Sequence, residues 1–203
     1  IYVATPHSHH YEHARLCLSA GRNVLCEKAF TANYKQAKEL IDLAESKGLY
    51  IGEAIWTRYL PMRFTLDEII ASGVIGEISS LTANLGYSIA HVERLRKPEL
   101  AGGALLDIGI YPITYCYNIF GYPDKIKCEG TIQNGIDIKE KVTLYYDNMP
   151  CELYMSFEKL KETFVIEGTE GKINVPMFHV SPFAILKSKK GNKIAFGKTT
   201  YLN

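Results

Sequence analysis

No part of this sequence is apolar over a length that would cross a membrane. The longest apolar region, from Gly102 to Tyr122, is interrupted by Asp107 and by several glycines. A transmembrane helix requires about 18 or more uninterrupted apolar residues. The sequence therefore predicts no membrane-spanning segment and no membrane partner.

An excess of charge of one sign is also absent. The chain has 23 Lys and Arg against 22 Asp and Glu, a formal net charge of +1, and both signs occur along its whole length. Binding to nucleic acid or to an anionic membrane relies on a basic patch, so this balance favours neither partner. The composition, 47% hydrophobic and 22% charged, is that of a globular protein with apolar material for one sizeable core or two modest ones.

The sequence has no closely spaced cysteine pair. Its five cysteines are odd in number, widely spread and never in a Cys-x-x-Cys arrangement. This usage indicates reduced thiols in the cytoplasm and does not support a zinc site. The five are Cys17, Cys26, Cys116, Cys128 and Cys151.

A group of histidines raises the question of a different metal site. The group consists of His7, His9, His10 and His13. Two of them, His9 and His13, are one helical turn apart, but no nearby cysteine or paired carboxylate completes a ligand set. We therefore predict no metal.

The first residues do not resemble the start of a complete protein. The chain opens on Ile1, without an initiator Met, in a sequence typical of the interior of a buried parallel strand. We expect further residues before Ile1 and also after Asn203.

Residues 1–54 alternate strand, helix, strand, helix and strand with short connections. Helices are expected from His10 to Ala20 and up to Gly48, each followed by a strand, at 23–27 and 49–54. Such alternation is typical of a parallel sheet with right-handed crossovers.

After residue 56 the pattern changes. We expect a helix at 61–72 with Phe64, Ile69 and Ile70 toward the core, a loop at 94–100 and a helix at 104–120. Strands are expected at 77–87, 126–133, 142–146, 151–157, 163–167 and 173–175, with turns at Asp147-Asn148 and Glu170-Gly171. The predicted fold is α/β: a partial Rossmann-type parallel sheet in residues 1–56, then an α+β domain with a largely antiparallel sheet in 57–203, for substrate binding and oligomerisation.

The segment that points most clearly to chemistry runs from Gly102 to Tyr111. It places Asp107 and Tyr111 four residues apart beside a glycine-rich turn. On a helix this spacing puts both side chains on one face. Their neighbours are apolar, so we expect the carboxylate and the phenol to face a cleft and to serve in proton transfer.

Lys28 is the third member of this predicted group. It follows an apolar strand that ends at Glu27. Tyr normally titrates near pH ~10, too high for a base at neutral pH, and a neighbouring ammonium favours the phenolate. Spacing alone favours a solvated Lys and a Tyr packed in the core, but the carboxyl end of a parallel strand is where open α/β sheets bind ligands, and this context favours a functional site.

Four segments match motifs of one enzyme family. Residues 5–10 (TPHSHH) follow its Thr-Pro-x-x-x-His motif, and residues 20–29 (AGRNVLCEKA) follow its Ala-Gly-Lys-x-Val-x-x-Glu-Lys-Pro segment. Together with residues 53–59 (EAIWTRY) and 102–111 (GGALLDIGIY), they make the chain resemble the glucose-fructose oxidoreductase, inositol dehydrogenase and MocA superfamily. Within it, the chain is most similar to the dimeric dihydrodiol dehydrogenase branch.

The sequence departs from the motifs of this superfamily at two positions. Ala29 stands where the family usually has Pro, the residue that favours a cis or kinked backbone after Lys28. Tyr111 stands where many members have His, a feature shared with the dihydrodiol dehydrogenase branch, and points to a phenol as the acid/base group.

The resemblance implies an NAD(P)-dependent dehydrogenase that uses NAD or NADP. It would transfer a hydride between the nicotinamide and a secondary hydroxyl of a sugar, polyol or cyclic trans-diol, and would form a homo-oligomer through the second-domain sheet. The implied catalytic residues are Lys28, Asp107 and Tyr111, and the implied cofactor-binding residues are Thr5, Pro6, His10, Glu27, Lys28, Trp56 and Arg58. Trp56 equally fits an ordinary core residue.

The family's glycine-rich turn for the pyrophosphate, Gly-x-Gly-x-x-Gly, does not occur in these 203 residues. The resemblance therefore implies that the first half of the dinucleotide-binding domain lies outside them. A second interpretation stays open, that of a binding or assembly module without catalysis, and the upstream sequence would distinguish the two.

Overall fold

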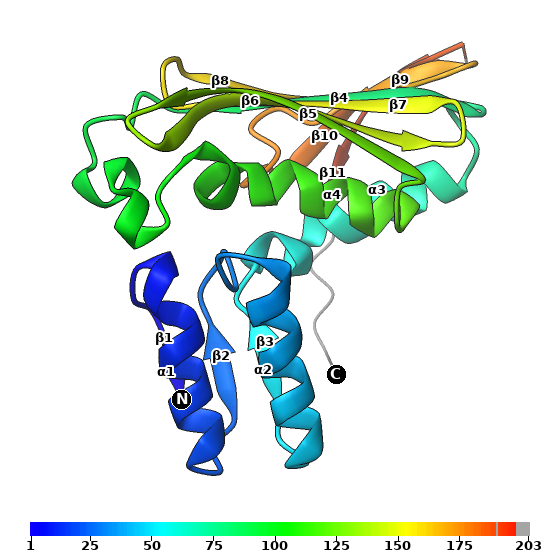
Figure 1. Cartoon of the computed structure of the whole chain (residues 1–203). Coiled ribbons are helices and arrows are strands. Elements are labelled where there is room, and N and C mark those ends of the chain that lie inside the picture. The colour runs from blue at the N-terminus through cyan, green and yellow to red at the C-terminus, as the bar shows by residue number, and fades with distance from the viewer. Residues whose placement is uncertain (190, 198–203) are drawn as a thin grey trace.

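The computed structural model describes residues 1–189 and 191–197, which form two sheets separated by helices (Figure 1). The smaller sheet is parallel, in the order β1 (Tyr2–Val3), β2 (Val24–Cys26) and β3 (Ile51–Glu53). Two helices, α1 (His7–Ser19) and α2 (Tyr34–Ser46), lie side by side on it. The predicted βαβ alternation is confirmed.

This small sheet is covered on one face only. Val24 and Cys26 are buried with Leu18 and Leu40 of the helices, whereas Leu25, between them, is 42% exposed. Alternating strand residues point to opposite faces, so the helices pack against the face of β2 that carries Val24 and Cys26. Helix α1 begins at His7, three residues earlier than predicted, because Pro6 at its N-cap already has φ −58°.

The larger sheet has eight strands in the order β11-β10-β9-β8-β4-β7-β6-β5. All neighbours are antiparallel except β4 and β7. The predicted, largely antiparallel sheet is thus confirmed. The strands are β4 (Ile78–Gly86), β5 (Lys125–Gln133), β6 (Ile136–Tyr146), β7 (Met149–Ser156), β8 (Lys161–Gly168), β9 (Gly171–Asn174), β10 (Phe183–Ser188) and β11 (Gly191–Phe196).

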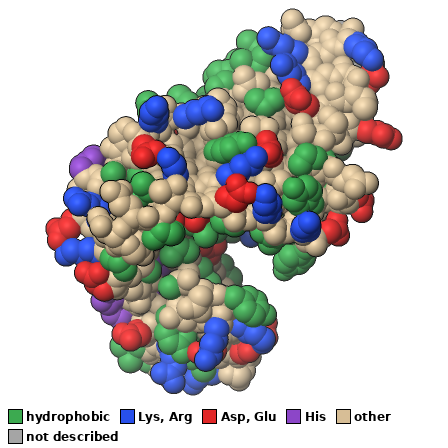
Figure 2. Space-filling view, turned by 45° about the horizontal axis from the view of Figure 1, so that its top comes forward, with side chains coloured by type: hydrophobic (Ala, Val, Ile, Leu, Met, Phe, Trp, Pro, Cys, Tyr) green, Lys and Arg blue, Asp and Glu red, His purple; other side chains and the backbone are tan. Residues whose placement is uncertain are grey.

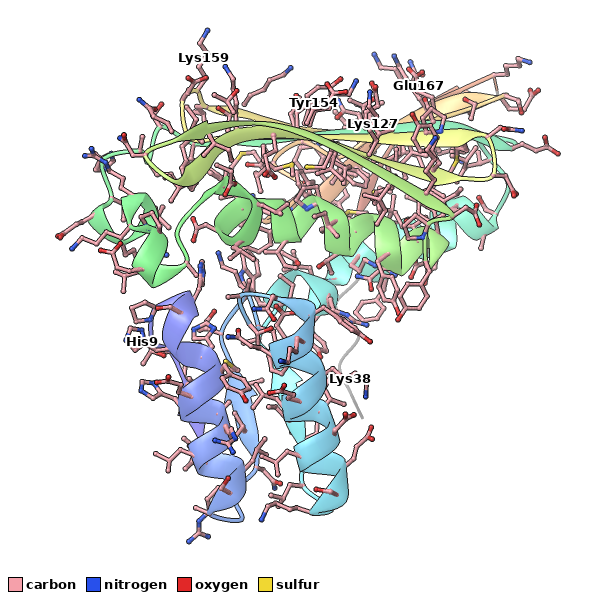
Figure 3. All side chains as sticks on the ribbon, viewed as in Figure 1. His9, Lys38, Lys127, Tyr154, Lys159 and Glu167 are labelled. Atoms are coloured by element: carbon pink, nitrogen blue, oxygen red, sulfur yellow. The ribbon has the colours of Figure 1, made fainter. Side chains whose placement is uncertain are left out.

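Helices α3 (Pro61–Ala71) and α4 (Ile110–Phe120) lie under one face of this sheet, between it and the small sheet (Figure 1). The main core fills the space between sheet and helices, with Leu81, Leu85, Leu153 and Phe164 among its fully buried members. In Figure 3 the labelled side chains of the sheet stand on the other face, pointing away from the helices.

Several local predictions were wrong. Phe64 is 48% exposed, and α3 instead buries Met62 and Leu66. The turn between β8 and β9 is formed by Thr169-Glu170, one residue earlier than predicted, because Gly168 pairs with Gly171. Strands β10 and β11 were not predicted.

The two segments expected as a loop and as a continuous helix have finer structure. Residues 94–100 contain two 3₁₀-helices, η2 (Glu93–Arg96) and η3 (Pro98–Leu100). The helix predicted at 104–120 starts as a π-helical turn, η4 (Leu105–Gly109), before it becomes α4. Such wide turns occur often at functional sites, and this one carries Asp107.

Candidate active site

Asp107 and Tyr111 lie in the layer between the two sheets. Asp107 belongs to η4 and Tyr111 to the first turn of α4, and they are only 5% and 8% exposed. Both side chains are therefore buried, but of the two only Asp107 lines the cavity described below, and Tyr111 is not among its lining residues. Their chemical roles remain predictions.

The glycine-rich turn before Asp107 is held by close backbone contacts. A Cβ on Gly102 would meet the carbonyls of Leu95 and Arg94. Gly103 has φ +120°, a conformation that residues with a side chain rarely adopt. The amide of Leu105 donates to Asp137 Oδ2 at 2.6 Å. A carboxylate on β6 thus caps the turn that presents Asp107.

Lys28 approaches both partners. It follows β2, and its Nζ donates to the Asp107 carbonyl oxygen at 2.5 Å and lies 3.4 Å from Asp107 Oδ1. The same Nζ is 4.9 Å from the centroid of the Tyr111 ring. The peptide bond between Lys28 and Ala29 is cis, so the special backbone shape at this point is present although alanine replaces the family's proline.

Arg94 is a second cation at Asp107 and was not predicted. Its guanidinium Nη2 lies 3.2 Å from Asp107 Oδ1. It extends from η2, a segment that the sequence indicated only as a loop. A single arginine in a loop gives no periodic signal, and its approach to Asp107 depends on the fold that returns residues 93–103 to this point.

A cavity of about 310 Å³ opens beside these groups. It lies at the carboxyl ends of β1 and β2, the edge at which open α/β sheets bind ligands. Of the predicted cofactor-binding residues, Thr5, Pro6, Glu27 and Lys28 line it. The full lining is Ala4, Thr5, Pro6, His7, Glu27, Lys28, Arg94 and Asp107.

The structure does not place His10 at this cavity. The His10 side chain is completely buried, and its ring nitrogens lie 2.8 Å from the Ala29 carbonyl oxygen and 2.7 Å from that of Thr5. It therefore connects the segments after β1 and β2, and can shape the cavity without touching what binds there.

Arg58 also lies outside the cavity lining. It is exposed on η1 (Trp56–Tyr59), and its charge acts on Glu53. Burial raises the pKa of the Glu53 carboxyl, opposed by the hydrogen bond from the Phe30 amide and by the Arg58 charge. His7, which does line the cavity, has its pKa lowered by burial.

Trp56 lies beside Tyr111 rather than in the core. The Trp56 side chain is 41% exposed, and its ring centroid is 6.1 Å from that of Tyr111 in an edge-to-face arrangement. His179, which the sequence did not indicate, lies 6.0 Å from Trp56 and 5.9 Å from Tyr111 between centroids. These three rings contact one another, and the Lys28 ammonium lies over one of them, that of Tyr111.

Among the residues that the structure describes, no three His, Cys, Asp or Glu side chains are grouped so that they could hold a metal ion. The rings of His9 and His13 stack side by side on α1, with centroids 5.7 Å apart. Within the same residues, no helix combines the length and apolarity needed to cross a membrane.

The fold is α/β, with a small parallel sheet whose carboxyl edge lies beside a lysine, a carboxylate and a phenol. Residues 1–54 match the oxidoreductase family with an NAD-binding Rossmann fold, and residues 64–174 match the GFO/IDH/MocA C-terminal domain. The chain belongs to the GFO/IDH/MocA family, and the resemblance seen in the sequence is confirmed.

The chain is similar in sequence to two curated dehydrogenases. Trans-1,2-dihydrobenzene-1,2-diol dehydrogenase of Mus musculus is 36% identical over 86% of this chain and 54% of its own length. D-xylose 1-dehydrogenase (NADP(+)) of Hypocrea jecorina is 45% identical over 58% of this chain and 32% of its own length. The chain spans about half the length of the diol dehydrogenases that it matches.

Solved structures share the fold. A variant of a 3-ketoreductase from Actinomadura kijaniata, in complex with TDP-benzene and NADP, has a TM-score of 0.87 at 22% identity, covering 96% of this chain and 63% of its own. An inositol dehydrogenase homologue from Azotobacter vinelandii, complexed with NADH and myo-inositol, has a TM-score of 0.84 at 18% identity, covering 100% and 57%.

Proposed function

We propose that this chain carries the catalytic centre of an NAD(P)-dependent dehydrogenase acting on CH–OH groups. The substrate would be a secondary alcohol on a sugar, polyol or cyclic trans-diol. The observation that supports this most strongly is the Lys28 ammonium, which meets both a buried carboxylate and a buried phenol at the carboxyl edge of the parallel sheet. The names of the relatives, a xylose and a diol dehydrogenase, fit the same chemistry.

The residues present fit the nicotinamide end of a dinucleotide. The cavity at the ends of β1 and β2 is lined by Thr5, Pro6, Glu27 and Lys28, which offer a hydroxyl, a carboxylate and an ammonium group, and the Trp56 indole lies partly exposed beside Tyr111. His10 would hold the loop that carries Thr5. When bound, NAD or NADP supplies the hydride acceptor or donor.

In the oxidation direction, Tyr111 would take the proton from the substrate hydroxyl. The Lys28 ammonium, 4.9 Å from the centroid of the Tyr111 ring, would stabilise the phenol oxygen during the proton transfer, and it would also donate a hydrogen bond to the substrate oxygen. Asp107 would orient the substrate and hold Lys28 in place, and Arg94 offsets the remaining negative charge of the carboxylate. Reduction would reverse these steps.

The test is the Tyr111→Phe substitution in the native-length protein. We expect turnover to fall by about 100- to 10,000-fold because the proton acceptor is lost, while titration with NADP or NAD gives nearly the wild-type affinity. Tyr122→Phe is the matched control, since Tyr122 is 84% exposed. Turnover retained by Tyr111→Phe would remove the phenol from the mechanism, and a wild-type protein that binds neither dinucleotide would favour the assembly-module alternative.

We further propose that the division of the chain falls after residue 56 and that a homo-oligomer forms through the free face of the eight-stranded sheet. Figure 2 shows acidic, basic and hydrophobic side chains intermixed on this part of the surface. Lys141 pairs with Glu152 there at 2.5 Å, next to Tyr154. Sedimentation analysis should show a dimer that Tyr154→Glu weakens and Tyr122→Glu does not. A wild-type monomer would contradict the proposal.

The proposed location is the cytoplasm. All five cysteines are free, and thiols of this kind persist in a reducing compartment. Imaging of the tagged native-length protein would test the location.

A further inference from the structure

A second, partly buried network of hydrogen bonds lies beside the proposed acid/base residue. Its members are His179, in the connection between β9 and β10, Glu162 at the start of β8, and Tyr87 directly after β4. The proposed mechanism uses none of them. Three parts of the chain that are distant in sequence therefore converge on one point of the site.

Glu162 fixes the histidine. Its side chain is only 7% exposed, and it accepts from His179 Nδ1 at 2.5 Å, from the His179 amide at 3.2 Å and from the Tyr87 hydroxyl at 3.1 Å. Burial alone would raise the pKa of this carboxyl, but these hydrogen bonds outweigh it and hold the pKa below its usual value. An ionised carboxylate can only accept, so the proton on Nδ1 is directed toward Glu162.

The ring that Glu162 holds is packed against the active site. The His179 centroid is 5.9 Å from Tyr111 and 6.0 Å from Trp56, and Trp56 and Tyr111 are themselves in edge contact. Tyr87 stands behind His179, with its hydroxyl 3.1 Å from Nε2. Movement of the imidazole would therefore release the Tyr111 ring on one side.

We propose that His179, oriented by Glu162, is a positioning residue for the Tyr111 phenol and the Trp56 indole. It would hold the phenol in line with the substrate oxygen while the Lys28 ammonium holds the charge. The inference rests on the proposed function, because it assigns the phenol the role given above. It differs from a purely structural role, in which Glu162 and His179 would only attach the β9–β10 connection to the sheet.

Kinetics of the native-length protein test the role in turnover. We expect His179→Gln to lower kcat by about tenfold to a hundredfold, since small displacements of a reacting group cost about this much, with KM nearly unchanged. Glu162→Gln should reproduce much of the loss. The matched control is His91→Gln, because His91 is exposed on the surface. An unchanged kcat in His179→Gln would overturn the proposal, even if that variant were less stable.

Fluorescence gives a readout that does not depend on activity. Trp56 is the single tryptophan among these 203 residues, so the emission of the protein reports on the surroundings of this one indole. The His179 ring lies 6.0 Å from it between centroids. Removal of the imidazole should therefore change the emission of Trp56 at a fixed pH.

The change should appear in His179→Gln and be absent in His91→Gln, with the spectrum of Trp56→Phe subtracted as background. An emission spectrum of His179→Gln that matches the wild type would contradict the placement of His179 against Trp56. A wild-type protein without nicotinamide-dependent turnover would overturn the proposed function and, with it, the role of His179 in turnover, while the emission measurement would still decide the placement.

Discussion

Asp107 is a buried carboxylate that lies within ion-pair distance of two cations. Lys28 and Arg94 both reach its Oδ1, and the side chain is almost fully buried. Its charge therefore serves stability as well as orientation, because a buried charge left without its partner is costly.

We expect Asp107→Asn to lower the free energy of unfolding by about 1–3 kcal/mol and to slow turnover. Urea unfolding of the variant measures the first effect. Asp42→Asn is the control, since Asp42 pairs with Lys38 in the open and exposed pairs contribute about 1 kcal/mol or less. Equal losses in the two variants would mean that Asp107 is not the centre of a buried charge network.

Glu140 gives a prediction about pH. Its Oε2 is buried without a hydrogen-bond partner, and burial together with the charge of Asp137 raises the pKa of this carboxyl to about 7. The folded state therefore favours the neutral acid. This contribution to stability is complete below the ordinary pKa of 4.5 and is lost as the pH rises through about 7.

Comparison of unfolding at pH 5 and pH 8 should show a smaller loss of stability in Glu140→Gln than in the wild type. Glu129→Gln serves as the control, because the Lys127 ammonium lowers the pKa of the exposed Glu129. An identical pH dependence in wild type and Glu140→Gln would show that Glu140 is ionised freely in the folded state.

At the scale of single residues, the sequence predicted those site residues that are marked by spacing. Asp107 and Tyr111 are four residues apart, so local spacing grouped these two, and Lys28 joined them through its place after a strand and through the family motif around it. Arg94 and His179 carry no such pattern. Their neighbours in the site come from other elements, and only the folded chain brings them together.

Among the elements, the π-helical turn η4 is the one on which the site depends most. Gly102 precedes it, packed so closely on the carbonyls of Leu95 and Arg94 that a Cβ has no room. We expect Gly102→Ala to cost about 1–3 kcal/mol in unfolding free energy, as overpacking does, and to lower turnover by displacing Asp107.

The control for this substitution is Gly130→Ala. A Cβ there would touch mainly the flexible Glu140 side chain, at 3.1 Å. If both variants unfolded at the same urea concentration as the wild type, the turn would be looser than its contacts indicate.

Element types followed from the sequence more easily than their details. The alternation of strand-like and helix-like segments predicted the βαβ arrangement of residues 1–54. Residues typical of turns marked most of the later strands. The wide turn at 105–109 is invisible to a helical pattern, because its residues remain helical in composition. The end of β10 and the start of β11 lie in a sequence rich in Lys, Gly and Asn. This composition hides the alternation of apolar and polar residues that is typical of a strand.

In the whole molecule, the site lies between the two sheets, which helices separate (Figure 1). The segment after β2 of the small parallel sheet supplies Lys28, η4 and α4 supply Asp107 and Tyr111, and the β9–β10 connection supplies His179. Composition and charge indicated a globular protein without a nucleic-acid surface, but the distance between these two parts is a property of the fold that no local pattern contains.

In the proposed mechanism, Lys28 and Tyr111 act together on one proton. The most direct test is a double-mutant cycle of single-turnover hydride transfer in the native-length protein, with Lys28→Met, Tyr111→Phe and the double variant. Residues that act as a unit are strongly non-additive, so we predict that the double variant is hardly slower than Tyr111→Phe alone. If the two losses instead multiplied, the lysine and the phenol would act independently, and the account of this site would be wrong.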